Sequence, residues 1–205
     1  MVTGKDATRR AFLKKAAVSA LGFSIVPRHV LGGPGFVPPS EKVNVAIIGT
    51  GGMGMRNAQA LLNEPEARIA AVCDVAERTD LTAYWYRCHA GRLPTKALIE
   101  KHYAETVPGY RCPDYEDFRV MLEKEKDIDA ILCATPDHSH ACVVITAMRM
   151  GKHVYCEKPL AHNIWECRQI AKVAKETGVA TQLGNHGHSG SGIRMICEWV
   201  WDGAI

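Results

Sequence analysis

Short apolar runs alternate with longer amphipathic stretches from residue 43 onward. The first run, 43–48, ends in glycines and is typical of a buried parallel strand. Strand-like runs follow at 68–73, 130–134, 152–156 and 179–183. Helical spacing occupies 53–62, 115–125, 141–150 and 164–177, and the last two of these stretches are closed by glycines. This alternation predicts right-handed βαβ crossovers and a parallel sheet with helices on both faces.

The segment 76–107 interrupts this rhythm, because it is polar and mixed. We interpret it as an insertion that carries a helix over 96–103 and precedes a short third strand near Tyr110. The fold class predicted is therefore α/β, a doubly wound parallel sheet over residues 41–184.

The N-terminus reads as a targeting segment. Thr8-Arg9-Arg10-Ala11-Phe12-Leu13-Lys14 resembles the bacterial twin-arginine export signal, and the apolar stretch 16–26 that follows is too short to span a bilayer. An ordinary amphipathic helix is the alternative. We expect residues 1–40 to be a signal and linker, either cleaved near 27–40 or retained as a membrane anchor. The expected location is periplasmic or otherwise exported, with the twin-arginine machinery as a partner.

The charge pattern argues against a nucleic-acid partner. The net charge of +3 arises in residues 1–28, which hold six Lys and Arg side chains against Asp6 alone. The remainder is slightly acidic and offers no basic patch. The eight cysteines are scattered without a C-x-x-C pair, which favours buried thiols over a disulfide framework.

A glycine-rich loop follows the first predicted strand. Gly49-Thr50-Gly51-Gly52-Met53-Gly54 fits G-x-G-x-x-G between a strand and a helix, the context that a Rossmann dinucleotide site requires. Gly49 can make the tight turn, Gly51 allows close approach of a pyrophosphate, and Gly54 lets the helix pack on the strand. The first amide groups of the helix then face the phosphates.

An acidic residue follows the second predicted strand. Asp74 lies 20 residues after Gly54, where a carboxylate can bind the adenosine ribose. A 2′-phosphate would meet like charge there, so the cofactor predicted is NAD, with NADP disfavoured. Arg78 lies nearby and weakens this discrimination.

Two further motifs carry a family resemblance. Ala134-Thr135-Pro136-Asp137-His138-Ser139-His140 follows one predicted strand, and Glu157-Lys158-Pro159 follows a Gly-Lys-His-Val strand. With the glycine loop they resemble the Gfo/Idh/MocA oxidoreductases over about residues 43–184, most closely the exported subgroup with a twin-arginine leader. The family implies NAD(P)-dependent hydride transfer on a sugar, polyol or related carbohydrate, and a homo-oligomeric full-length form. It also implies that residues 185–205 begin a truncated α+β C-terminal domain that binds substrate.

The resemblance also implies roles for individual residues. Lys158 would be the catalytic acid–base group beside the nicotinamide. Thr135, Pro136 and His140 would line the nicotinamide side, and Glu157 would lie near the ribose. Position supports this, because both motifs follow strands at the carboxyl edge of the sheet.

Several alternatives stay open. The histidines at 138, 140, 186 and 188 lack suitably spaced acidic or cysteine partners, so no metal site is predicted. The segment 184–188 departs from the arginine-containing sequence that is more usual in this family, so the identity of the substrate stays open. Besides a dehydrogenase, the chain suits an NAD-dependent glycoside hydrolase of the same family or a non-catalytic cofactor-binding fragment.

Overall fold

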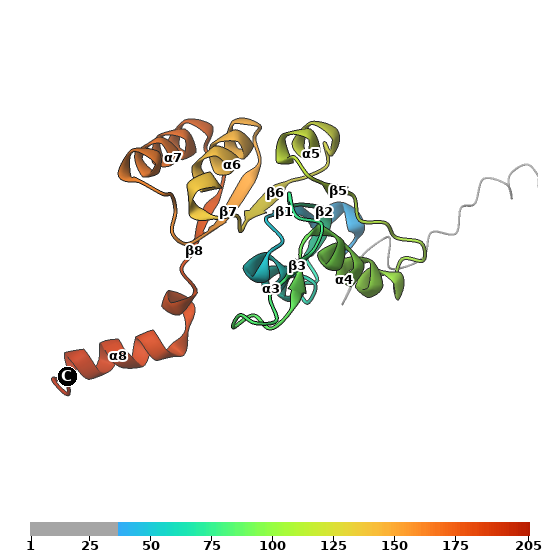
Figure 1. Cartoon of the computed structure of the whole chain (residues 1–205). Coiled ribbons are helices and arrows are strands. Elements are labelled where there is room, and N and C mark those ends of the chain that lie inside the picture. The colour runs from blue at the N-terminus through green and yellow to red at the C-terminus, as the bar shows by residue number, and fades with distance from the viewer. Residues whose placement is uncertain (1–36) are drawn as a thin grey trace, which may run out of the picture. The chain divides into compact units, whose positions relative to one another are not determined.

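The computed structural model describes residues 37–205, of which 42–205 form one compact unit. A six-stranded parallel sheet crosses this unit, with the order β5-β2-β1-β6-β7-β8 (Figure 1). Its strands are β1 (Val43–Ile48), β2 (Ala67–Cys73), β5 (Asp114–Tyr115), β6 (Ala130–Cys133), β7 (His153–Glu157) and β8 (Thr181–Gly184). The order runs outward in both directions from β1 and β6, which is the doubly wound arrangement that the sequence predicted.

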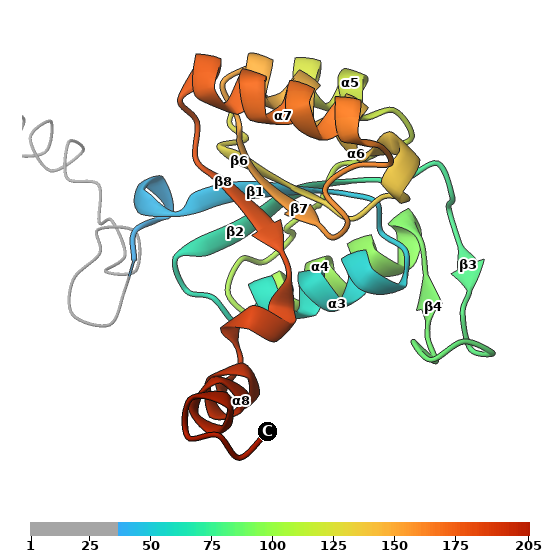
Figure 2. The same ribbon diagram turned by 90° about the vertical axis from the view of Figure 1, so that its left-hand side faces the viewer.

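Helices cover both faces of the sheet (Figure 2). One face carries α3 (Gly52–Leu61) and α4 (Arg92–Ala104); the other carries α5 (Phe118–Lys124), α6 (Asp137–Arg149) and α7 (Ile164–Thr177). Successive strand residues point to opposite faces, so Ile47 belongs to the core under α3 and α4, whereas Ile48 belongs to the core under α5, α6 and α7. Burial on both sides explains why these strands read as continuous apolar runs.

The remaining elements are short or peripheral. They are η1 (Pro39–Glu41), a hairpin of β3 (Thr79–Asp80) and β4 (His89–Ala90), η2 (His186–Ser189) and α8 (Ser191–Trp201). No residue of α8 is buried. The region 185–205, predicted to open a second domain, thus consists of η2, α8 and their flanking residues.

The predicted export signal lies outside the described residues. Within residues 37–205, no helix is long and apolar enough to cross a membrane.

Several predicted elements differ from those observed. The third strand is Asp114–Tyr115 and not near Tyr110, whose hydroxyl instead donates to the carbonyl of Ile69 at 2.7 Å. The segment 76–107 is the β3–β4 hairpin followed by α4, a helix longer than the predicted 96–103. Finally, α5 begins at Phe118, because the Asp117 carboxylate caps it by accepting from the Arg119 amide at 2.9 Å.

Candidate dinucleotide-binding site

A cavity of about 850 Å³ lies where β1, β2, β6 and β7 end. This volume is within the range of small-molecule and cofactor sites. The carboxyl edge at which the strand order reverses is where doubly wound folds bind ligands. Nine residues of the predicted site line the cavity: Gly49, Gly51, Gly52, Met53, Asp74, Thr135, Pro136, Glu157 and Lys158. Thr50, Gly54 and His140 lie behind this lining.

The glycines of the loop meet different steric demands. Gly49 has φ +86°, and a Cβ there would lie 2.6 Å from the backbone of Ala134. A Cβ on Gly54 would lie 1.9 Å from the carbonyl oxygen of Gly49, so only glycine lets α3 approach the loop this closely. A Cβ on Gly51 would meet no protein atom within 4 Å. The space next to Gly51 is therefore available to a ligand.

The start of α3 opens into the cavity. Gly51 is the N-cap residue, and no side chain caps the helix. The amide groups of a first helical turn have no partner within the helix and bind anions well. The sequence Gly51-Gly52-Met53 therefore presents a surface suited to phosphate.

Asp74 holds the glycine loop in place. Its carboxylate accepts from the amide of Thr50 at 2.6 Å, from the hydroxyl of Thr50 at 3.2 Å and from the amide of Ala76 at 2.9 Å. Thr50 itself is fully buried. The sequence predicted a ribose contact for Asp74; the structure adds a bracing role, and a carboxylate retains lone pairs for a further donor.

The other end of the cavity carries Lys158. This side chain is exposed and lines the cavity together with Thr135 and Pro136. His138 and Ser139 line it as well, and the sequence argument gave neither a role in the site. The omission follows from placing the start of the helix at 141, whereas α6 begins at Asp137 and turns its first residues toward the cavity.

His140 connects the loop that follows β6 to the loop that follows β7. Its side chain is buried, with Nδ1 2.7 Å from the carbonyl oxygen of Pro159 and Nε2 2.7 Å from that of Thr135. Both partners are carbonyl oxygens, which can only accept, so the ring is held between two acceptors. The sequence placed His140 on the nicotinamide side of the site; in the structure its ring contacts these two carbonyls and is not among the residues that line the cavity.

Two cysteines lie beside this histidine. Cys133 and Cys156 are opposite each other on β6 and β7, and their sulfurs and a His140 nitrogen lie within 4.8 Å of one another. Hydrogen bonding from Cys156 lowers the pKa of the Cys133 thiol, and the same interaction raises that of Cys156. The donor types suit a metal, but an ion would have to displace a carbonyl from His140. Local spacing could not find this cluster, because the strands bring it together.

Glu157 is a second buried polar centre. It accepts from the side-chain amide of Asn57 at 2.7 Å, and His186 Nε2 lies 3.1 Å from both carboxylate oxygens. The residue is 4% exposed and lines the cavity beside Lys158. Asn57 comes from α3 and His186 from η2, contacts that no motif in the sequence indicated.

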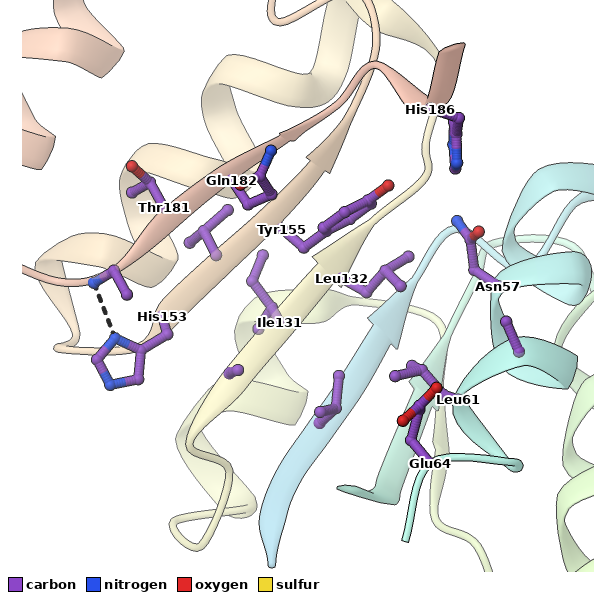
Figure 3. A pocket seen from close by; sticks show the side chains of 15 residues that line it. Asn57, Leu61, Glu64, Ile131, Leu132, His153, Tyr155, Thr181, Gln182 and His186 are labelled. Carbon is purple, nitrogen blue, oxygen red and sulfur yellow. Dashed lines mark hydrogen bonds between the residues drawn. The ribbon is translucent and has the colours of Figure 1, made fainter. Parts of the chain in front are cut away.

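A second cavity, of about 620 Å³, lies between α3 and the strands β6, β7 and β8. Figure 3 shows Asn57 and His186 close together at one end, with Tyr155 and Leu132 along the strands. None of the predicted site residues lines this second cavity. It is linked to them through Asn57 and His186, which contact Glu157. The chemistry-bearing residues thus concentrate in the larger cavity.

Comparison with known proteins agrees with this geometry. Residues 43–185 match the family model described as the oxidoreductase family with an NAD-binding Rossmann fold. The chain belongs to the Gfo/Idh/MocA family. The match covers all six strands of the sheet and every residue that lines the larger cavity.

Several relatives resemble the chain over part of their length. A glycosyl hydrolase family 109 protein of Shewanella pealeana is 28% identical, with 95% of this chain and 43% of that protein covered. An inositol 2-dehydrogenase of Rubrobacter xylanophilus is 31% identical over 68% of this chain and 33% of that protein. The chain thus spans less than half the length of these relatives.

Solved structures show the same fold. The myo-inositol 2-dehydrogenase of Lactobacillus plantarum is 27% identical with a TM-score of 0.60, over 80% of this chain and 42% of that one. A scyllo-inositol dehydrogenase of Lactobacillus casei, solved with NAD(H) and scyllo-inositol, gives a TM-score of 0.61 at 22% identity and the same coverage.

Proposed function

We propose that this chain is the cofactor-binding part of an NAD-dependent dehydrogenase that acts on a sugar or polyol. One observation carries the proposal. A single cavity joins the uncapped start of α3, which suits phosphate, to Lys158 at its other end. A dinucleotide laid along this cavity would place its nicotinamide near Lys158. The named inositol dehydrogenases among the relatives support a polyol as substrate class.

Lys158 would move the proton while the cofactor takes the hydride. As a neutral amine next to the reacting carbon, Lys158 would accept the proton of the alcohol as its oxygen becomes a carbonyl. The resulting ammonium would return that proton in the reverse reaction. His140 supports this arrangement as a positioning residue, since it joins the loop of Thr135 to the carbonyl of Pro159, next to Lys158. When bound, NAD supplies the hydride acceptor.

The proposal is tested at two levels. NADH fluorescence titration of the 205-residue chain should give saturable binding; absence of binding would sink the cofactor assignment. In a full-length form that includes the expected substrate domain, Lys158→Ala should lower kcat by about 10²–10⁴-fold. The Kd for NADH should change less than about threefold. Lys152→Ala is the matched control, because Lys152 caps carbonyls of Lys126 and Ile128 away from the cavity. If kcat decreases by less than about threefold, Lys158 is not the acid–base group.

A hydrolase is the second candidate. The Shewanella relative named as a glycosyl hydrolase matches 95% of this chain. Such an enzyme would oxidise the sugar with bound NAD and reduce it again, with no net change in the cofactor. Net NADH formation from a free polyol favours the dehydrogenase, whereas release of an aryl leaving group from a glycoside without net NADH favours the hydrolase.

We further propose that the protein is exported by the twin-arginine route, on the strength of Arg9 and Arg10 and the apolar stretch after them.

A further inference from the structure

The β3–β4 hairpin stands beside the glycine loop. Thr79 pairs with Ala90 and Asp80 with His89, antiparallel and outside the six-stranded sheet. Figure 2 shows the hairpin beyond the carboxyl ends of the strands, next to α3 and α4. The family resemblance in the sequence gave this segment no function.

The base of the hairpin is fixed to the loop. The amide of Gly91 donates to the carbonyl of Thr50 at 2.8 Å, and the amide of Arg92 donates to that of Ala76 at 3.0 Å. Gly91 has φ +105°, and a Cβ there would lie 2.7 Å from the carbonyl oxygen of Glu77. Any side chain at 91 would break this close contact. The hairpin is therefore held in a set position relative to the glycine loop.

Two aromatic rings reach the loop from the tip. A Cβ on Gly52 would lie 2.3 Å from the ring of Tyr86, so this ring rests directly on the loop. Trp85 packs against Tyr86, with ring centroids 4.0 Å apart, and the Arg56 guanidinium carbon lies 5.0 Å from the Trp85 centroid. Both rings line the larger cavity, although Trp85 remains 65% exposed.

We propose that Trp85 and Tyr86 form an aromatic flap that covers the diphosphate and adenosine of the bound dinucleotide and slows its release. The flap rests on the proposed cofactor function, because its ligand is that cofactor. A diphosphate held by the amides of Gly51-Gly52-Met53 lies next to the ring on Gly52. Arg56 places a positive charge beside the same rings, where it complements the phosphates.

The flap acts on the ligand in two ways. Aromatic faces stack on a base whatever its identity, which suits the adenine half and leaves the nicotinamide free to react. Rings over the phosphates also exclude water and strengthen the amide–phosphate bonds beneath them. Release then requires the tip to move away while Gly91 stays bound to Thr50.

Dissociation rates test the flap. NADH and ADP-ribose are displaced from the 205-residue chain by excess NAD in a stopped-flow instrument. Trp85→Ala and Tyr86→Ala should each speed release of both ligands about tenfold, the loss expected for one stacking contact. Trp165→Ala is the matched control, because Trp165 is 69% exposed at the start of α7. Its rates should match those of the unmodified chain.

Energy transfer gives a readout that does not depend on kinetics. Excitation of Trp85 should sensitise NADH emission, so Trp85→Phe should remove most of this signal and Trp165→Phe should not. Rates within twofold of the unmodified chain in both alanine variants, or equal sensitised emission in both phenylalanine variants, overturn the flap while leaving the cofactor site intact. An unmodified chain that binds neither NADH nor ADP-ribose overturns both proposals.

Discussion

Alanine substitution at two glycines of the same loop should affect different properties: stability at Gly54 and cofactor affinity at Gly51. A Cβ on Gly54 would lie 1.9 Å from the carbonyl oxygen of Gly49, against the 3.4 Å at which ordinary contact begins. The helix would have to move by about 1.5 Å, and its contact is backbone that cannot rotate aside. Alanine at 51 meets no protein atom within 4 Å, at a φ of −65° that any residue adopts.

The magnitudes follow from these distances. Overpacking of this kind costs about 1–3 kcal/mol. Alanine recovers about 1 kcal/mol of helix propensity over glycine, so the clash wins. A 1.9 Å contact with backbone lies at the upper end of the overpacking range, about 3 kcal/mol. Gly54→Ala should therefore lower the free energy of unfolding by about 2 kcal/mol net. Gly51→Ala should lower it by less than about 1 kcal/mol, the difference between glycine and alanine at an N-cap. Its methyl group instead occupies the space for pyrophosphate and should weaken NADH binding at least about tenfold.

Urea unfolding followed by circular dichroism measures the first quantity, and NADH titration measures the second. Two results would refute the reasoning. One is a Gly54→Ala chain that unfolds at the urea concentration of the unmodified chain. The other is a Gly51→Ala chain with unchanged NADH affinity, since it would mean that the cofactor does not approach this backbone.

Three other variants test the roles of Asp74, of the buried His140 and of the twin-arginine segment. Asp74→Ala should narrow the preference for NADH over NADPH, measured as the ratio of their Kd values, and an unchanged ratio would exclude the ribose contact. His140→Leu should destabilise the chain by about 2 kcal/mol in urea, because the carbonyl oxygens of Thr135 and Pro159 lose their hydrogen bonds to the buried ring; a change under about 0.5 kcal/mol would contradict this. Arg9→Lys with Arg10→Lys should keep a fused reporter in the cytoplasm, whereas undiminished export would remove the twin-arginine interpretation.

Local patterns predicted the parts of the fold that depend on local physics. The runs at 43–48 and 130–134 are apolar because β1 and β6 are buried on both faces, so a continuous run identified each of them. The steric roles of Gly49 and Gly54 also followed from the motif, since a tight turn and a close helix leave no room for a Cβ.

Local patterns failed where long-range contacts decide. β5 is only two residues long, too short for a period, and pairing with β2 alone defines it. The sequence did not indicate the partners of His140, because its bond to Pro159 joins positions 19 apart in the chain. The contact between Asn57 and Glu157 spans 100 positions, and no spacing rule reaches that far.

The way the hairpin is attached has a consequence for how this protein can diverge. Near its base, the bonds from Gly91 to Thr50, from Arg92 to Ala76 and from Leu81 to Cys88 run between main-chain groups. Main-chain bonds tolerate changes of side chain except where, as at Gly91, the backbone angle demands glycine. Residues 82–87 can therefore be substituted, by natural mutation or by design, while the glycine loop keeps its shape. With the proposed flap at this tip, substitutions there would change the affinity for the cofactor without changing the fold.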